Sequence, residues 1–172
     1  VEGTNSWIDS VGDTFNIAKK IIGDAKQKIL PQIQKSLDDK KINNKITVSG
    51  YEGSELIVAR TLIEAGAEVP YVGTACPKTK WSTEDKDWLE SKGVFVKFRA
   101  SLEDDISAVK SVNPDLAIGT TPVVQKAKEL GIPSLYYTNL ISARPIMGVA
   151  GAGRLAEVIL QAIGNGSRME KM

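Results

Sequence analysis

The side chains best suited to ligand binding lie in three short polar segments. Residues 50–54 read Gly-Tyr-Glu-Gly-Ser between a predicted strand and a predicted helix, and the backbone N–H groups of such a turn can hold an anion. The alternative is a tight turn in which Ser54 caps the helix. Residues 119–122 (Gly-Thr-Thr-Pro) and 138–139 (Thr-Asn) offer uncharged hydrogen-bonding groups that suit a large neutral or weakly polar ligand, although these residue types are also common in turns and caps.

Three other features admit both a functional and a structural interpretation. Arg144 could pair with a carboxylate or lie over an aromatic plane, or it could bond loop carbonyls at the surface. Cys76 is the only cysteine, and a thiol without a histidine to activate it is more often inert, so its role stays open. Residues 151–156 match the dinucleotide pattern G-x-G-x-x-A, but no predicted strand leads into them. That context favours a helix start that needs close backbone packing.

The composition excludes several classes of active site. The chain has 172 residues, a net charge of +1, no histidine and one cysteine. Ser-His-Asp triads, Cys-His pairs and imidazole zinc sites are therefore excluded, and one cysteine can neither close an internal disulfide nor hold an iron–sulfur cluster alone. The near-neutral charge predicts no binding of nucleic acid, and no apolar run approaches the roughly 18 residues that a membrane span needs.

The length and the first residue shape our expectation of the context. About 170 residues form one domain of ordinary size. The chain begins with Val1 rather than Met, and its first residues do not form a signal peptide. We therefore expect a domain of a longer cytoplasmic protein.

The elements that must position the polar segments show two different spacings of apolar residues along the chain. Residues 1–44 are predicted to be a helical segment, with a capping box of Ser6 and Asp9, a break near Gly23 and a kink at Pro31. From residue 45 strands alternate with helices. The predicted strands are 46–49, 68–72, 94–98, 115–118 and 134–138.

Capping residues predict where several of the helices begin. Ser82 with Asp85 and Ser101 with Asp104 form capping boxes, and Thr121 precedes a proline at the first helical position. A last helix is expected over residues 153–163, closed by a glycine.

This alternation predicts an α/β fold, with a three-layer Rossmann-like domain over residues 45–172 preceded by the helical segment. We expect a five-stranded parallel sheet of order 3-2-1-4-5, in which the winding reverses between the first and fourth strands. Ligands bind such sheets at the carboxyl ends of the strands that flank the reversal. Residues 50–54 and 119–122 should therefore meet there, with the loop 139–148 at the border. No acid, base, nucleophile or metal set that could act alone is evident.

Four longer runs at these strand ends resemble the Y-subunit family of the bacterial chlorophyllide reductases, which are nitrogenase-like oxidoreductases. The runs are residues 48–56, 72–77, 117–127 and 137–145, and the resemblance extends over nearly the whole chain. It implies that the chain is the carboxyl-terminal domain of a longer subunit and is inactive alone.

The resemblance further implies a two-component enzyme. An ATP-dependent iron–sulfur reductase would deliver electrons to a heterotetramer of Y and Z subunits that contains a 4Fe-4S cluster. The heterotetramer would reduce a ring double bond of chlorophyllide a in bacteriochlorophyll synthesis. The cluster ligands of the family lie in an amino-terminal domain, so this chain is expected to bind no cofactor itself.

The resemblance also directs attention to the residues after the fifth strand. In the nitrogenase catalytic subunit a histidine there ligates the metallocofactor, whereas residues 136–139 of this chain are Tyr-Tyr-Thr-Asn. This substitution implies a tetrapyrrole pocket in place of a metallocofactor site. No catalytic residue is assigned, and the predicted substrate-binding residues are Tyr51, Glu52, Thr120, Thr121, Gln125, Thr138, Asn139 and Arg144.

Two other hypotheses compete with this one. The glycine-containing turns would also suit an autonomous flavodoxin-like module that binds a nucleotide or phosphate. The second competing hypothesis is a sister enzyme of the same group, such as the protochlorophyllide reductase. The runs at residues 120–125 and 142–145 argue against this hypothesis.

Overall fold

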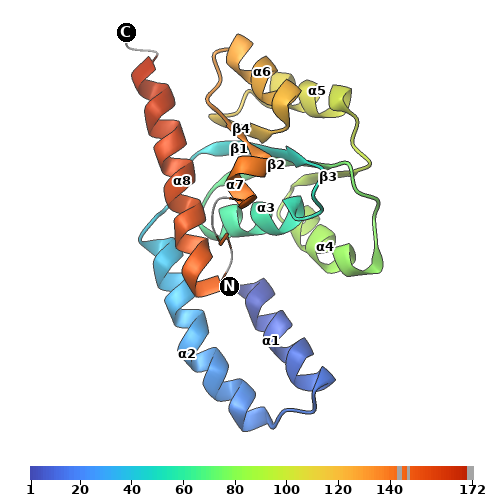
Figure 1. The fold of residues 1–172 in the computed structure, drawn as a ribbon, viewed down its shortest axis with the longest axis vertical. Coiled ribbons are helices and arrows are strands. Elements are labelled where there is room, and N and C mark those ends of the chain that lie inside the picture. Colours follow the sequence, from blue (N-terminus) through green and yellow to red (C-terminus); the bar gives the residue numbers. More distant parts are fainter. Residues whose placement is uncertain (143–144, 147, 170–172) are drawn as a thin grey trace.

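The computed structural model describes residues 1–142, 145–146 and 148–169, and it has the predicted α/β architecture (Figure 1). The elements in chain order are α1 (Glu2–Thr14), α2 (Lys19–Asp38), β1 (Lys45–Gly50), α3 (Glu55–Glu64), β2 (Glu68–Thr74), η1 (Lys80–Ser82), α4 (Thr83–Ser91), β3 (Phe95–Phe98), α5 (Leu102–Val112), β4 (Leu116–Gly119), α6 (Thr121–Glu129), β5 (Ser134–Tyr136), α7 (Tyr137–Ser142) and α8 (Gly148–Met169). None of the described helices is both long enough and apolar enough to span a membrane.

The five strands form one parallel sheet in the order β3-β2-β1-β4-β5, which confirms the predicted topology. Strand β1 is central, and its Val48 pairs with Val72 of β2 on one side and Ile118 of β4 on the other. Because the chain winds outward from β1 in both directions, the crevice between the ends of β1 and β4 is open to a ligand.

Two apolar layers hold the helices on the sheet. Helices α5 and α6 lie on one face, and α3, α4 and α8 lie on the other (Figure 1). Successive side chains of β4 point to opposite faces of the sheet and so contribute to both layers. Leu116 and Ile118 enter the larger core, and Ala117 enters the smaller core beneath α5 and α6. The strands therefore carry nearly continuous apolar runs, as expected for a sheet covered on both faces.

The amino-terminal helices differ from the sequence prediction. Helix α1 begins at Glu2, so Ser6 lies inside the helix and forms no capping box with Asp9. The break falls at residues 15–18, where Asn16 has a positive φ of 50°, and α2 continues through Gly23. Helix α2 packs against α8 and buries Ile33 and Leu37 in the larger core. The domain boundary after residue 44 stays a prediction.

Of the three caps predicted for α4, α5 and α6, the one at α5 is confirmed and the other two are wrong. Ser101 and Asp104 form the expected reciprocal box at α5. The box near α4 instead joins Thr79 to Ser82, because the chain first makes the short helix η1. At α6 the N-cap is Thr120 rather than Thr121.

The last two helices differ from the prediction, because α7 was not expected and α8 begins earlier than expected. Strand β5 ends at Tyr136, and α7 follows at once, so residues 137–142 are helical rather than strand and loop. Helix α8 begins at Gly148 rather than Gly153. A Cβ at Gly153 would lie 2.9 Å from the Cβ of Ser36 on α2, and one at Gly151 would lie 2.6 Å from the carbonyl carbon of Ile146. Close packing therefore explains the glycines of the G-x-G-x-x-A pattern.

Candidate functional site

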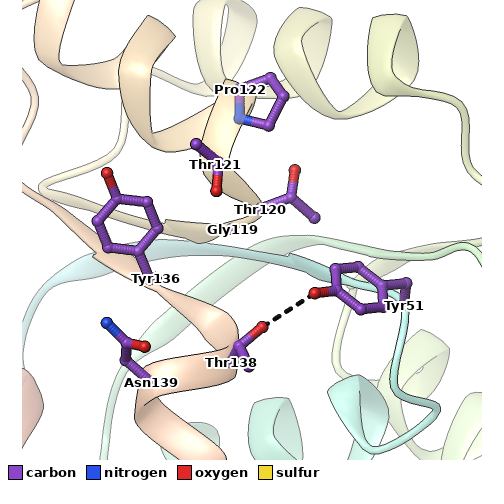
Figure 2. Close-up of a pocket in the computed structure, with 8 residues that line it drawn as sticks. All are labelled: Tyr51, Gly119, Thr120, Thr121, Pro122, Tyr136, Thr138 and Asn139. Atoms are coloured by element: carbon purple, nitrogen blue, oxygen red, sulfur yellow. Dashed lines mark hydrogen bonds between the residues drawn. The ribbon is translucent and has the colours of Figure 1, made fainter.

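A cleft of about 430 Å³ opens at the carboxyl ends of β1, β4 and β5, where the topology predicts a ligand site (Figure 2). Its walls come from the turn after β1, the start of α6, the end of β5 and the first turn of α7. The lining residues are Tyr51, Gly119, Thr120, Thr121, Pro122, Tyr136, Thr138 and Asn139.

The wall at α6 is formed by a strand that turns directly into a helix. A Cβ at Gly119 would lie 2.5 Å from Cγ1 of Val123, so glycine allows β4 to meet α6 this closely. Thr120 has an extended backbone at the N-cap, and its side chain makes no capping hydrogen bond. Its hydroxyl and that of Thr121 are therefore available at the cleft, with Thr121 pointing toward Tyr136 in Figure 2.

A side-chain hydrogen bond closes the opposite wall. The hydroxyl of Tyr51, after β1, lies 3.1 Å from Oγ1 of Thr138 on α7. Thr138 and Asn139 therefore reach the cleft from the first turn of a helix, and not from a strand end as expected. Tyr51 remains about half exposed, so its ring offers an accessible apolar surface beside the hydrogen bond.

The turn after β1 is held from within by Glu55. Its Oε1 accepts a hydrogen bond from the N–H of Glu52 at 2.8 Å, and its Oε2 accepts one from the N–H of Gly53 at 3.0 Å. Ser54 precedes α3 without making a capping hydrogen bond, and its hydroxyl lies 2.8 Å from that of Tyr137 instead. Ser54 therefore occupies the N-cap position, as the tight-turn alternative expected, but its side chain does not cap the helix.

Tyr137 lies fully buried behind this turn. Burial raises the pKa of its phenol, and the hydrogen bond with Ser54 opposes that rise while the nearby carboxylates of Glu55 and Glu52 add to it. Tyr137 therefore stays neutral at physiological pH and serves as a hydrogen-bonding group rather than an anion.

The structure brings together five of the eight predicted substrate-binding residues: Tyr51, Thr120, Thr121, Thr138 and Asn139. Glu52 and Gln125 are exposed nearby but do not line the cleft, and Arg144 lies outside the described residues. Tyr136 was missed, because the predicted strand continued past it. Its position directly before a Tyr-Thr-Asn run could have marked it as a strand end.

The residues present do not fit an iron–sulfur cluster. Such clusters are held mainly by several cysteines, and the sequence has one cysteine and no histidine. Within the part of the chain that the structure describes, no group of three or more His, Cys, Asp and Glu could hold a metal. Cys76 lies beside the turn after β1, with its Sγ 3.5 Å from the carbonyl oxygen of Tyr51.

A second hollow, of about 590 Å³, lies between α1, α3, α4 and α8, away from the strand ends. Its buried cation is already partnered, since Arg60 binds Asp85 at 2.6 Å and covers the ring of Trp88 at 4.7 Å. The strand-end cleft is therefore the candidate site.

Comparison with known proteins identifies the family. Residues 1–164 match the sequence profile of the nitrogenase component 1 type oxidoreductases. The chain belongs to this family. It is 61% identical over 171 residues to the chlorophyllide reductase 52.5 kDa chain of Cereibacter sphaeroides and 60% identical to that of Rhodobacter capsulatus. It is 23% identical over 162 residues to subunit N of the light-independent protochlorophyllide reductase of Prochlorococcus marinus.

The matched family members are much longer than this chain. The two chlorophyllide reductase alignments cover 99% of this chain but 34% of each relative, and the third covers 92% and 38%. A solved structure of nitrogenase Cp1 at pH 6.5 shares the fold, with a TM-score of 0.65 at 22% identity over 96% of this chain and 38% of the other. The chain thus spans about a third of the length of these relatives.

Proposed function

We propose that the chain is part of the Y subunit of a chlorophyllide a reductase and that its strand-end cleft forms one wall of the tetrapyrrole pocket. The observation that carries this proposal is the 61% identity to a chlorophyllide reductase chain across 99% of this sequence. The position of the cleft supports it, because the cleft lies at the crevice where sheets of this topology bind ligands.

The chemistry of the cleft suits part of a large macrocycle. The rings of Tyr51 and Tyr136 offer flat apolar surfaces, while the hydroxyls of Thr120 and Thr121 and the amide of Asn139 offer hydrogen bonds to ring substituents. In this proposal the chain binds and orients the tetrapyrrole and leaves the transfer of electrons to other parts of the enzyme.

The partners follow from the same proposal. Since the residues present do not fit a cluster, a 4Fe-4S cluster would be ligated by other parts of a heterotetramer with the Z subunit. An ATP-dependent iron–sulfur reductase would supply the electrons to that heterotetramer. We assign the complex to the cytoplasm, where ATP is available to the reductase, and expect the chain to be inactive alone.

An autonomous phosphate-binding module is less well supported. That hypothesis requires free N–H groups in the turn after β1, and those of Glu52 and Gly53 are bonded to Glu55.

The test is the Thr121→Val variant of the complete subunit, purified with its partner subunit and assayed with the reductase, ATP and chlorophyllide a. Losing a hydrogen bond of about 0.5–1.5 kcal/mol should raise KM for chlorophyllide roughly 2- to 10-fold. Arg144→Ala tests the predicted residue outside the described ranges in the same assay.

Thr14→Val is the matched control, since Thr14 is an exposed threonine at the end of α1, remote from the cleft. It should leave KM unchanged. Unaltered KM and turnover in both Thr121→Val and Arg144→Ala would contradict the assignment of the pocket, whereas a preparation that never consumes chlorophyllide would contradict the activity.

A further inference from the structure

The turn after β1 holds an anion that belongs to the chain itself. The N–H groups of Glu52 and Gly53 are consecutive along the backbone, and they donate to the two different oxygens of the Glu55 carboxylate. Two adjacent N–H groups that converge on one anion, at the start of a helix, form the arrangement by which strand–turn–helix units bind phosphate.

Glu55 is completely buried, which makes its ionic partners important. Among the described residues no lysine or arginine forms an ion pair with it. The two N–H donors and the positive end of the α3 dipole are therefore what stabilises the carboxylate, because Glu55 is the first residue of that helix.

The surroundings leave room for this carboxylate and little else. A Cβ at Gly50 would lie 2.5 Å from Oε1 of Glu55 and 2.9 Å from Cδ1 of Tyr137. Gly53 has a φ of 85°, a conformation that favours glycine. The backbone on one side and the Tyr137 ring on the other therefore enclose the carboxylate.

The turn also carries Tyr51, whose hydroxyl bonds Thr138 across the cleft. Tyr51 lies between Gly50, which packs on the carboxylate, and Glu52, which donates to it. The position of the Tyr51 side chain is thus tied to the carboxylate of Glu55 through the backbone of the turn.

We propose that Glu55 is an internal anion that occupies the phosphate position of this turn and thereby excludes phosphate groups from the crevice and positions Tyr51 against Thr138. It is a positioning and specificity-determining residue, not a catalytic one. The assignment rests on the contacts of the turn and does not depend on which ligand the cleft binds.

The test replaces the internal anion with one from solution. Glu55→Ala removes the carboxylate from the full chain and leaves two buried N–H groups and a cavity. We expect a lower melting temperature that acetate or inorganic phosphate restores, by about 5–10 °C at 100 times the dissociation constant. Sodium chloride at matched ionic strength should restore much less, and the unsubstituted chain should respond equally to phosphate and chloride.

Glu129→Ala is the matched control, because Glu129 is an exposed glutamate at the end of α6 that pairs with Lys126. Its melting temperature should show no preference for acetate or phosphate over chloride. A rise that is the same in Glu129→Ala and Glu55→Ala would reflect general salt stabilisation and would overturn the proposal.

Two further results would also overturn it. One is stabilisation of the unsubstituted chain by phosphate to the same extent as Glu55→Ala, since the site would then be open with Glu55 in place. The other is a Glu55→Ala protein that acetate and phosphate stabilise no more than chloride does.

If Glu55→Ala does not fold, Glu55→Ser also removes the carboxylate and vacates its space, while a small polar side chain remains at the start of the helix. Phosphate should then move the backbone amide resonance of Gly53 in Glu55→Ser and leave it unmoved in the unsubstituted chain. Equal shifts in both proteins, or none in Glu55→Ser, would contradict the proposal.

Discussion

Replacing Asp105 with asparagine should make the fold more stable at neutral pH. Asp105 lies on α5 with 7% of its surface exposed, and it accepts a hydrogen bond from the hydroxyl of Tyr71 at 2.7 Å. Burial raises the pKa of its carboxyl from 3.8 to about 6. The hydrogen bond from Tyr71 opposes this rise, and the carboxylates of Asp104 and Glu55 add to it. The folded chain therefore binds the proton of Asp105 more tightly than the unfolded chain does.

The sign and size of the effect follow from this difference. Below pH 3.8 Asp105 is protonated in both states and does not lower the free energy of unfolding. Between pH 3.8 and about 6 it ionises in the unfolded state first, so the free energy of unfolding falls as the pH rises. Above that range the full loss in the free energy of unfolding persists. A shift of about two pKa units corresponds to a loss of about 3 kcal/mol. About 2 kcal/mol of this loss falls between pH 4.5 and 7.5.

Asp105→Asn removes the titration and keeps an oxygen that can accept from Tyr71. Urea denaturation of both proteins, followed by tryptophan fluorescence at pH 4.5, 6.0 and 7.5, gives the difference in the free energy of unfolding. We expect that difference to move by about 2 kcal/mol in favour of the variant between pH 4.5 and 7.5.

Asp104→Asn is the matched control. Hydrogen bonds from the N–H and hydroxyl of Ser101 lower the pKa of the Asp104 carboxyl, with a smaller contribution from Lys97. Its ionisation therefore stabilises the folded state increasingly as the pH rises to about 3.8, and by a constant amount above that pH. Because both of its pKa values, folded and unfolded, lie at or below 3.8, Asp104→Asn should leave the difference nearly flat between pH 4.5 and 7.5. A difference for Asp105→Asn that is as flat with pH as that of Asp104→Asn, or that moves against the variant as the pH rises, would refute the reasoning.

Two further predictions concern packing and capping. Gly153→Val should lower the free energy of unfolding by about 2 kcal/mol, because its Cβ would press on Ser36 of α2. Its control is Gly164→Val on the same helix, where a Cβ meets no atom within 4 Å. In urea denaturation Gly164→Val should therefore lower the free energy of unfolding clearly less. Ser101→Ala should cost about 1 kcal/mol through loss of the α5 cap, and Ser111→Ala, which removes only a bond to a carbonyl within that helix, should cost less; equal losses for the two would contradict the capping argument.

The strand positions were predictable because the local and tertiary preferences agree. Each strand of the sheet is a short apolar run between turn residues, and the burial of both sheet faces requires the same apolar side chains that favour extended backbone. Near α1 these preferences diverge. Ser6 and Asp9 have the spacing of a capping box, but a box requires the chain to enter the helix at the serine, and α1 has already begun at Glu2. A pattern of four residues does not specify where the preceding chain starts its helix.

For the candidate site too, the features that follow from topology were predictable, and those that depend on tertiary packing were not. Topology alone placed the turns after β1 and β4 at one crevice, because parallel strands end at the same edge of the sheet. Glu55 was not predicted, since a glutamate in the first helical turn ordinarily complements the helix dipole in solvent. Its different role arises from burial, and burial depends on Tyr137, which arrives from the far end of β5 to cover it. The residue that controls the turn is therefore adjacent to it in sequence but acquires its function from a distant segment.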